Sequence, residues 1–211
     1  MSFQIAALEY FLNYHGQKYI APAKAGEEKD IMETFKKDGQ TARQAFTELA
    51  QSVDQSLQDF HMQKVSSWMN QAQIGRPHFW CYFKREEESK HDPHFAIRLI
   101  TLDDGLGISV EVSFIERGVV PETIVRQNQV LAVPIQAPLY YLAQSNGVSS
   151  RYKATEENRL FLQEAVADKT VRKVLVKVDI PKLSSYSDQE ALVTAILEGF
   201  RLLSPYYLAT K

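Results

Sequence analysis

Residues 77–115 read PHFWCYFKREEESKHDPHFAIRLITLDDGLGISVEVSFI, and this stretch carries the strongest structural signal in the chain. Its last run places an apolar side chain at every second position from Leu106 to Phe114. Strand side chains alternate between two faces, so a one-residue slip would expose all of these apolar groups. The same alternation predicts three strands, at 79–84, 94–101 and 106–115. A turn at Asp103–Gly105 joins the last two strands as a hairpin.

The opposite side of these strands is what we call the mixed face, because it carries aromatic, charged and hydroxyl groups. Its members are Trp80, Tyr82, His94, Arg98, Ser109, Glu111 and Ser113. An arginine beside aromatic rings and a carboxylate can hold an anionic or planar ligand by hydrogen bonding and stacking. A competing interpretation needs no ligand: Arg98 and Glu111 form a cross-strand pair, and a helix covers Trp80.

The sequence before this stretch is mostly helical in pattern. Apolar residues at steps of three or four predict helices at 3–15, 27–37 and 41–60, with Asp38–Gly39 ending the second. Residues 62–71 suit either a continuation of the third helix or a short separate one.

The sequence after this stretch alternates between strand and helix signals. Strands are expected at 139–144, 148–153 and 171–180, and residues 130–135 fit a further strand that Pro134 would place at an edge. Helices are expected at 122–129, where the pattern is ambiguous and fits a short helix behind Pro121, and at 155–167 and 187–203. In the second of these Leu160, Phe161 and Ala165 should face inward; in the third Ser187 and Glu190 form a capping box and Pro205 ends the helix.

Sequential hairpins favour an antiparallel sheet with helices packed against it. We therefore predict an α+β fold: N-terminal helices, a central mostly antiparallel sheet of five or six strands, and C-terminal helices on one face. The 211 residues suit a single domain, with a helical part at 1–75 and the sheet with its helices at 76–211.

Composition limits the function. The formal net charge is −2, whereas nucleic-acid binding usually requires a basic excess, so no nucleic acid is expected as a partner. The N-terminus lacks the basic start of a signal peptide, and its apolar stretch is too short to span a bilayer. Cys81 is the one cysteine, which fits a reducing compartment and predicts a cytoplasmic protein without a membrane association.

Metal and cofactor motifs are weak. His91 and His94 resemble half of a metal site, but they lie beside the acidic run Glu86–Glu88 in what reads as a solvated loop, where no regular spacing fixes the geometry. Gly105 and Gly107 open a strand, whereas the dinucleotide fingerprint opens a helix. We expect neither a metal nor a cofactor, and we expect Cys81 to be a buried, unactivated thiol.

The span Pro77–Gly118, with PLYYLAQSNG at 138–147, resembles a small bacterial family of uncharacterised proteins of about this length. Some members of that family carry a glucose-6-phosphate dehydrogenase label. Such an enzyme needs a βαβ cofactor fold and a substrate domain, for which this chain has neither the length nor the glycines. The resemblance therefore transfers no catalytic residue.

Three hypotheses for function remain. The first is a binding protein that holds a small anionic or planar ligand, or a peptide, on the mixed face. The second is a hydrolase or transferase that uses Glu111 or His94 as acid or base beside Arg98. The third is a homodimer that docks through Tyr206, Tyr207 and Leu208; alternatively, this tail folds back on its own core.

Overall fold

A computed structural model describes residues 4–116 and 120–211. Within them, the α-helices are α1 (Ile5–Leu12), α2 (Lys29–Asp54), α3 (Pro121–Asn128), α4 (Glu156–Ala167) and α5 (Gln189–Ala209). The strands are β1 (His61–Met62), β2 (Trp80–Lys84), β3 (His94–Leu102), β4 (Gly105–Ser113), β5 (Tyr140–Ser145), β6 (Val148–Lys153) and β7 (Lys173–Ile180). Short 3₁₀ turns are η1 (Pro22–Lys24), η2 (Gly26–Glu28), η3 (Gln129–Ala132) and η4 (Leu183–Ser185).

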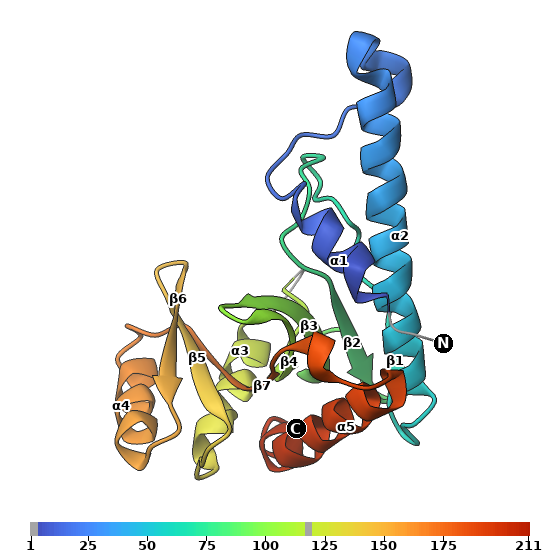
Figure 1. The fold of residues 1–211 in the computed structure, drawn as a ribbon. Helices are drawn as coiled ribbons and strands as arrows, with labels where there is room; N and C mark the ends of the chain where they lie inside the picture. Colours follow the sequence, from blue (N-terminus) through green and yellow to red (C-terminus); the bar gives the residue numbers. More distant parts are fainter. Residues whose placement is uncertain (1–3, 117–119) are drawn as a thin grey trace.

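The strands form one sheet in the order β1-β2-β3-β4-β7-β5-β6, and every neighbouring pair is antiparallel. Figure 1 shows α1 and α2 beside β2, α5 close to the lower end of α2, and α4 beside β5 and β6. The α+β class and the antiparallel sheet are confirmed. The strand number is not, because seven strands form where five or six were expected. The difference is β1, whose two residues are too few to show any alternation in a sequence.

The β3–β4 hairpin has the register that the alternation demands, with Arg98 opposite Ser109 and Ala96 opposite Glu111. Strand β7 enters the sheet between β4 and β5, so that residues distant in sequence meet across β4. This insertion places Lys177 directly opposite Glu111. The local sequence pattern does not predict that β7 is the neighbour of β4.

Helix α2 corrects the prediction of two helices separated at Asp38–Gly39. It runs unbroken for 26 residues and forms the long helix of Figure 1. Gly39 lies inside it, buried against the Trp68 indole, and a Cβ added at Gly39 would lie 2.6 Å from a ring carbon. Glycine is here a packing requirement, and tertiary contact overrides its usual helix-ending tendency. Residues 62–71, expected to be helical, instead form β1 and an irregular segment that carries Trp68 to this contact.

Gly39→Ala should therefore destabilise the protein, although alanine is the better helix former. Helix propensity favours alanine by about 1 kcal/mol, but overpacking a core costs about 1–3 kcal/mol. We expect a net loss of about 1 kcal/mol in the free energy of unfolding, measured by urea denaturation. Gln40→Ala, at an exposed position of the same helix, is the control. Stabilisation by Gly39→Ala would show that the Trp68 contact is not tight.

Helix α5 differs from expectation at both ends. Asp188, not Ser187, is the N-cap: its carboxylate accepts a hydrogen bond of 2.8 Å from the backbone N–H of Ala191. Pro205 lies inside the helix, which continues to Ala209. Tyr206 and Tyr207 are buried, so burial of two aromatic rings sustains the last turns past the proline. The tail folds back on its own core, and docking through these two tyrosines is wrong; Leu208 alone of the three is exposed.

Two further predictions are wrong. Residues 130–135, expected to be a strand, begin with η3, which buries Val130 and Leu131. In α4, Leu160 and Phe161 are exposed, and the inward residues are Leu162 and Ala165. The inward stripe was assigned one helical position too early, and only Ala165 of the three expected residues is buried.

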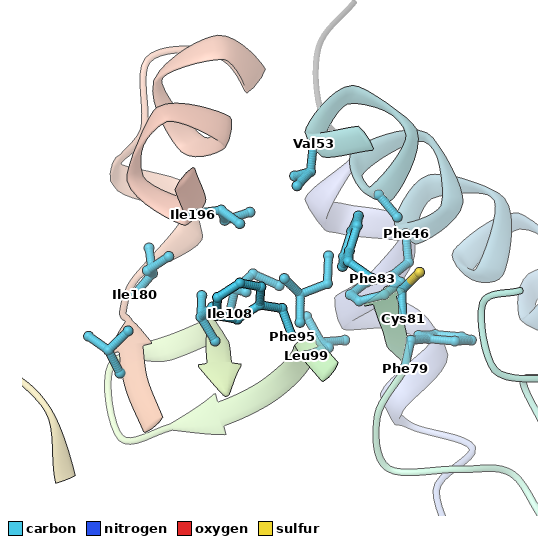
Figure 2. Packing of buried hydrophobic residues seen from close by; sticks show 14 of the residues in the cluster. Phe46, Val53, Phe79, Cys81, Phe83, Phe95, Leu99, Ile108, Ile180 and Ile196 are labelled. Atoms are coloured by element: carbon cyan, nitrogen blue, oxygen red, sulfur yellow. The ribbon is translucent and has the colours of Figure 1, made fainter. Parts of the chain in front are cut away.

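The apolar sheet face and the helices form a shared core. Figure 2 shows Phe79, Cys81 and Phe83 of the β2 region meeting Phe46 of α2, with Ile196 of α5 beyond. Phe95 stacks on Phe200 at 4.8 Å between ring centroids. Cys81 is buried as expected, and burial raises the pKa of its thiol to about 12. Among the described residues, none of the helices has the length and apolar character needed to cross a membrane.

Candidate functional site

The sheet register brings most of the mixed face together. Trp80 of β2 lies opposite Arg98 of β3, which lies opposite Ser109 of β4. The adjacent row contains Tyr82 of β2 and Glu111 of β4, with Ala96 of β3 between them. Five of the seven predicted residues therefore occupy two neighbouring rows across three strands.

Glu111 is the electrostatic centre of this face. It is fully buried, with Arg98 Nη2 at 3.2 Å from Oε1 and Lys177 Nζ at 2.8 Å from Oε2. Burial by itself raises the pKa of a carboxyl group, but Lys177 and Arg98 outweigh it and lower the pKa of Glu111 to about 2. Glu111 is therefore an anion at any physiological pH, and it faces two cations.

Trp80 lies beside Arg98 and is half-buried. The Arg98 guanidinium carbon is 5.3 Å from the centre of the indole ring, and that of Arg76 is 4.8 Å away. Both distances fall within cation–π range. The ring of His78 is tilted against Trp80 at 5.6 Å. The indole is thus surrounded by cationic and aromatic groups, while its residue remains partly open to solvent.

Tyr82 bounds the other side of Glu111. Its hydroxyl donates a hydrogen bond of 3.2 Å to the backbone oxygen of Phe114. Burial, followed by the charge of Glu111, raises the pKa of Tyr82 to about 12. Tyr82 is therefore a neutral donor that fixes the end of β4.

Ser109 and Ser113 are both buried. The Ser109 hydroxyl has no hydrogen-bond partner among the described residues. Ser113 lies opposite His94 in the register. Nδ1 of His94 is held by Glu88, and no hydrogen bond between the described residues joins the Ser113 hydroxyl to the His94 ring.

His94 belongs to a second cluster, which adjoins the mixed face at Tyr82. Its ring is completely buried, with Nδ1 at 3.2 Å from Glu88 Oε2. The other Glu88 oxygen accepts a hydrogen bond from the Tyr207 hydroxyl of α5 and lies 3.4 Å from Lys211 Nζ. Burial lowers the pKa of His94 more than Glu88 raises it. Through Glu88, His94 thus links the β2–β3 connection to the end of α5, and its ring also meets the ring of Tyr82 edge to face, with 6.5 Å between centroids.

The prediction that Glu86–Glu88 is a solvated tip is wrong at Glu88, which is buried while Glu86 and Glu87 are exposed. The burial of Glu88 could not be predicted from local sequence, since its partners lie in β3 and near the C-terminus. Across residues 4–116 and 120–211, no three His, Cys, Asp or Glu side chains converge as a metal site requires. His91 does not take part in the Glu88 contacts. The Thr123 hydroxyl donates a hydrogen bond to the backbone oxygen of His91.

Lys177 also lies on the mixed face, opposite Glu111, and was not predicted there. Its strand was expected, but the prediction rested on Val174, Val176 and Val178, which point to the apolar face of the sheet. The available signal is a lysine between two valines, in the middle of a strand that is buried along most of its length. The partner strand was still needed to pair it with Glu111.

A protein-family model matches residues 15–104. The match covers less than half of the chain and includes α2, β2 and β3, with Trp80, Tyr82 and Arg98. It ends before Glu111 and Lys177, so it contains only part of the mixed face. No curated protein matches the chain. The comparisons therefore assign no activity to the mixed face, and its chemistry must be argued from its geometry.

Proposed function

We propose that this chain binds a small anion that carries a planar ring, at the Trp80–Arg98 end of the mixed face. The observation that supports this most directly is the shared carboxylate: one buried anion, Glu111, faces both Arg98 and Lys177. The group of three carries a surplus positive charge. Arg76 adds a further guanidinium, 4.8 Å from the centre of the Trp80 ring.

Arg98 is placed to serve a ligand. Its side chain is 24% exposed, whereas those of Glu111 and Lys177 are almost inaccessible. A guanidinium has five N–H donors, and its fork matches a carboxylate or a phosphate. Glu111 orients the Arg98 guanidinium by contacting one of its nitrogens, Nη2, so that other N–H groups remain to bind an anion. The half-buried Trp80 offers a stacking surface beside them.

The geometry gives less support to a hydrolase or transferase. Glu111, held ionised by two cations, is a weak acid–base group near neutral pH, where a catalytic pKa should lie close to the working pH. His94 is inaccessible and bonded to Glu88. A binding role requires only charge and stacking, which the mixed face supplies.

The test is a thermal-shift screen that pairs anionic aromatic compounds with neutral analogues: benzoate with benzamide, and adenosine monophosphate with adenosine. A ligand that binds the folded state raises the melting temperature by mass action. We expect stabilisation by the anionic members only. The shift should vanish in Arg98→Gln and shrink in Trp80→Leu.

Arg201→Gln is the matched control, because Arg201 is an exposed arginine on α5 that pairs only with Glu198 within the described residues. It removes the same charge far from the mixed face and should keep the full ligand shift. The proposal fails if anions and neutral analogues act alike. It also fails if Arg98→Gln, corrected for its own stability, keeps the shift.

We also propose the cytoplasm as the location. The support is the sequence itself, with one cysteine, together with the buried position of Cys81. A thiol without a disulfide partner in its own chain suits a reducing compartment.

A further inference from the structure

A cavity of about 590 Å³ lies between α3 and α4, outside the mixed face. Its walls are Ile124 and Val125 of α3, Val166 of α4, and Leu131 at the base of η3. Ligand sites of small molecules are mostly apolar and occupy about 300–1,000 Å³. The size and the lining of this cavity both fall in that class.

Hydrogen bonds fix the position of each wall of this cavity. On one side, the Asn128 side chain donates to the Arg172 backbone oxygen at 3.1 Å and accepts from the Val174 N–H at 2.8 Å, which ties α3 to β7. On the other side, Arg159 and Gln163 of α4 both donate to the Leu131 backbone oxygen, at 2.7 and 2.9 Å. Because both helices are fixed to their surroundings, the cavity is preformed.

The charge at the cavity has one sign. Lys169 and Arg172 contribute to its lining, and no Asp or Glu is among the described lining residues. Arg172 is partly engaged, since it donates to the Gln144 side chain at 3.0 Å and lies 3.9 Å from the Glu116 carboxylate, which is not a lining residue. Lys169 is exposed and, among the described residues, makes no ion pair or side-chain hydrogen bond. An apolar space beside an uncompensated lysine complements a molecule with an apolar body and one negative head.

We propose that this cavity binds an apolar monocarboxylate, with its hydrocarbon body against Val125, Leu131 and Val166 and its carboxylate at Lys169. Arg172 adds positive potential at the same end. The proposal is independent of the mixed face, because it shares no residue with it. It assigns the chain a second ligand of a different chemical class.

The experiment titrates isotope-labelled protein with decanoate and, separately, with decanol, which has the same chain length and a neutral head. Amide shifts are followed by NMR. We expect saturable shifts at residues 124–132 and 163–172, with no change of the Trp80 indole N–H. Decanoate should bind at least several-fold more tightly than decanol.

Two variants test the two halves of the site. Ala132→Phe, at an exposed lining position, should fill the cavity and weaken decanoate binding at least tenfold. Lys169→Gln should remove the preference for decanoate over decanol. The control is Lys182→Gln: Lys182 is also exposed and also has a left-handed backbone, with φ 51° against 67° for Lys169.

The proposal is overturned if decanoate and decanol bind equally well to the unaltered protein, or if no saturable shift occurs. It is also overturned if folded Ala132→Phe binds decanoate as before. Shifts of the Trp80 indole in place of residues 124–132 would locate the carboxylate on the mixed face and contradict this site while supporting the other.

Discussion

Glu111→Gln is expected to lower the free energy of unfolding by about 3–5 kcal/mol, the usual cost of removing one partner of a buried ion pair. Lys177 and Arg98 would then face an uncharged amide, and Lys177 is buried with almost no access to water. Urea denaturation at pH 7 measures the loss. The matched control is Glu116→Gln, which removes an exposed carboxylate paired with Lys173 and should change stability by about 1 kcal/mol or less.

The effect should depend on pH. The pKa of Glu111 is about 2 in the folded protein, below its ordinary value of 4.5. A depressed pKa contributes stability above about pH 4.5 that is lost as the pH falls toward 2. The difference in stability between the unaltered protein and Glu111→Gln should therefore be full at pH 6 and shrink between pH 4.5 and 2. A difference that stays constant over that range would contradict the ion-pair assignment.

A double variant separates charge from shape. Lys177→Met combined with Glu111→Gln removes both the carboxylate and the buried cation opposite it. Because the main uncompensated charge is gone, the double variant should be more stable than Glu111→Gln alone. If the two losses simply add, Lys177 and Glu111 do not interact.

Glu88→Ala is expected to lower the free energy of unfolding by about 3 kcal/mol, because it leaves several buried polar groups without a hydrogen-bond partner. The Tyr207 hydroxyl, the His94 ring and the Arg85 backbone N–H all use the Glu88 carboxylate. Each group left without a partner in the interior loses the free energy of its hydration. The measurement is again urea denaturation, with near-ultraviolet circular dichroism to report on the packing of Tyr207.

Glu87→Ala is the control for this variant. Glu87 is the neighbouring residue, of identical chemistry, but its side chain is 67% exposed and lies 3.9 Å from Lys211. It should leave stability almost unchanged. Tyr207→Phe should cost less than Glu88→Ala, since His94 and Arg85 keep their partner. Equal effects of Glu87→Ala and Glu88→Ala would show that the buried cluster does not form.

The central strands were predictable because their signal is local. Alternation from Leu106 to Phe114 defines which side chains point to the core, and the observed pairing of Arg98 with Ser109 follows from that alternation and a two-residue turn. The errors fall where a distant contact changes a local preference. Gly39 continues a helix because Trp68 packs on it, and Pro205 is tolerated because Tyr206 and Tyr207 are buried beyond it.

The candidate site divides in the same way. Trp80, Tyr82, Arg98 and Glu111 were grouped correctly from alternation alone, since they lie on neighbouring strands of a meander. His94 also follows this rule, since it lies opposite Ser113 and its ring meets Tyr82, but its bond to Glu88 at the strand end was not predicted. Alternation predicts the sheet face toward which a side chain points. It does not predict which partner a side chain at a strand end will contact.

The antiparallel strands and their two faces follow from the sequence, because they depend on residues close together along the chain. The sequence left open whether Arg98 pairs with Glu111 or with a ligand, and the ion pair and the total charge around it depend on the tertiary structure. Strand β7 is inserted beside β4 and brings Lys177 to Glu111, while α5 brings Tyr207 to Glu88. Both contacts join residues more than 60 positions apart, and no local preference encodes which distant strand or helix will supply the partner.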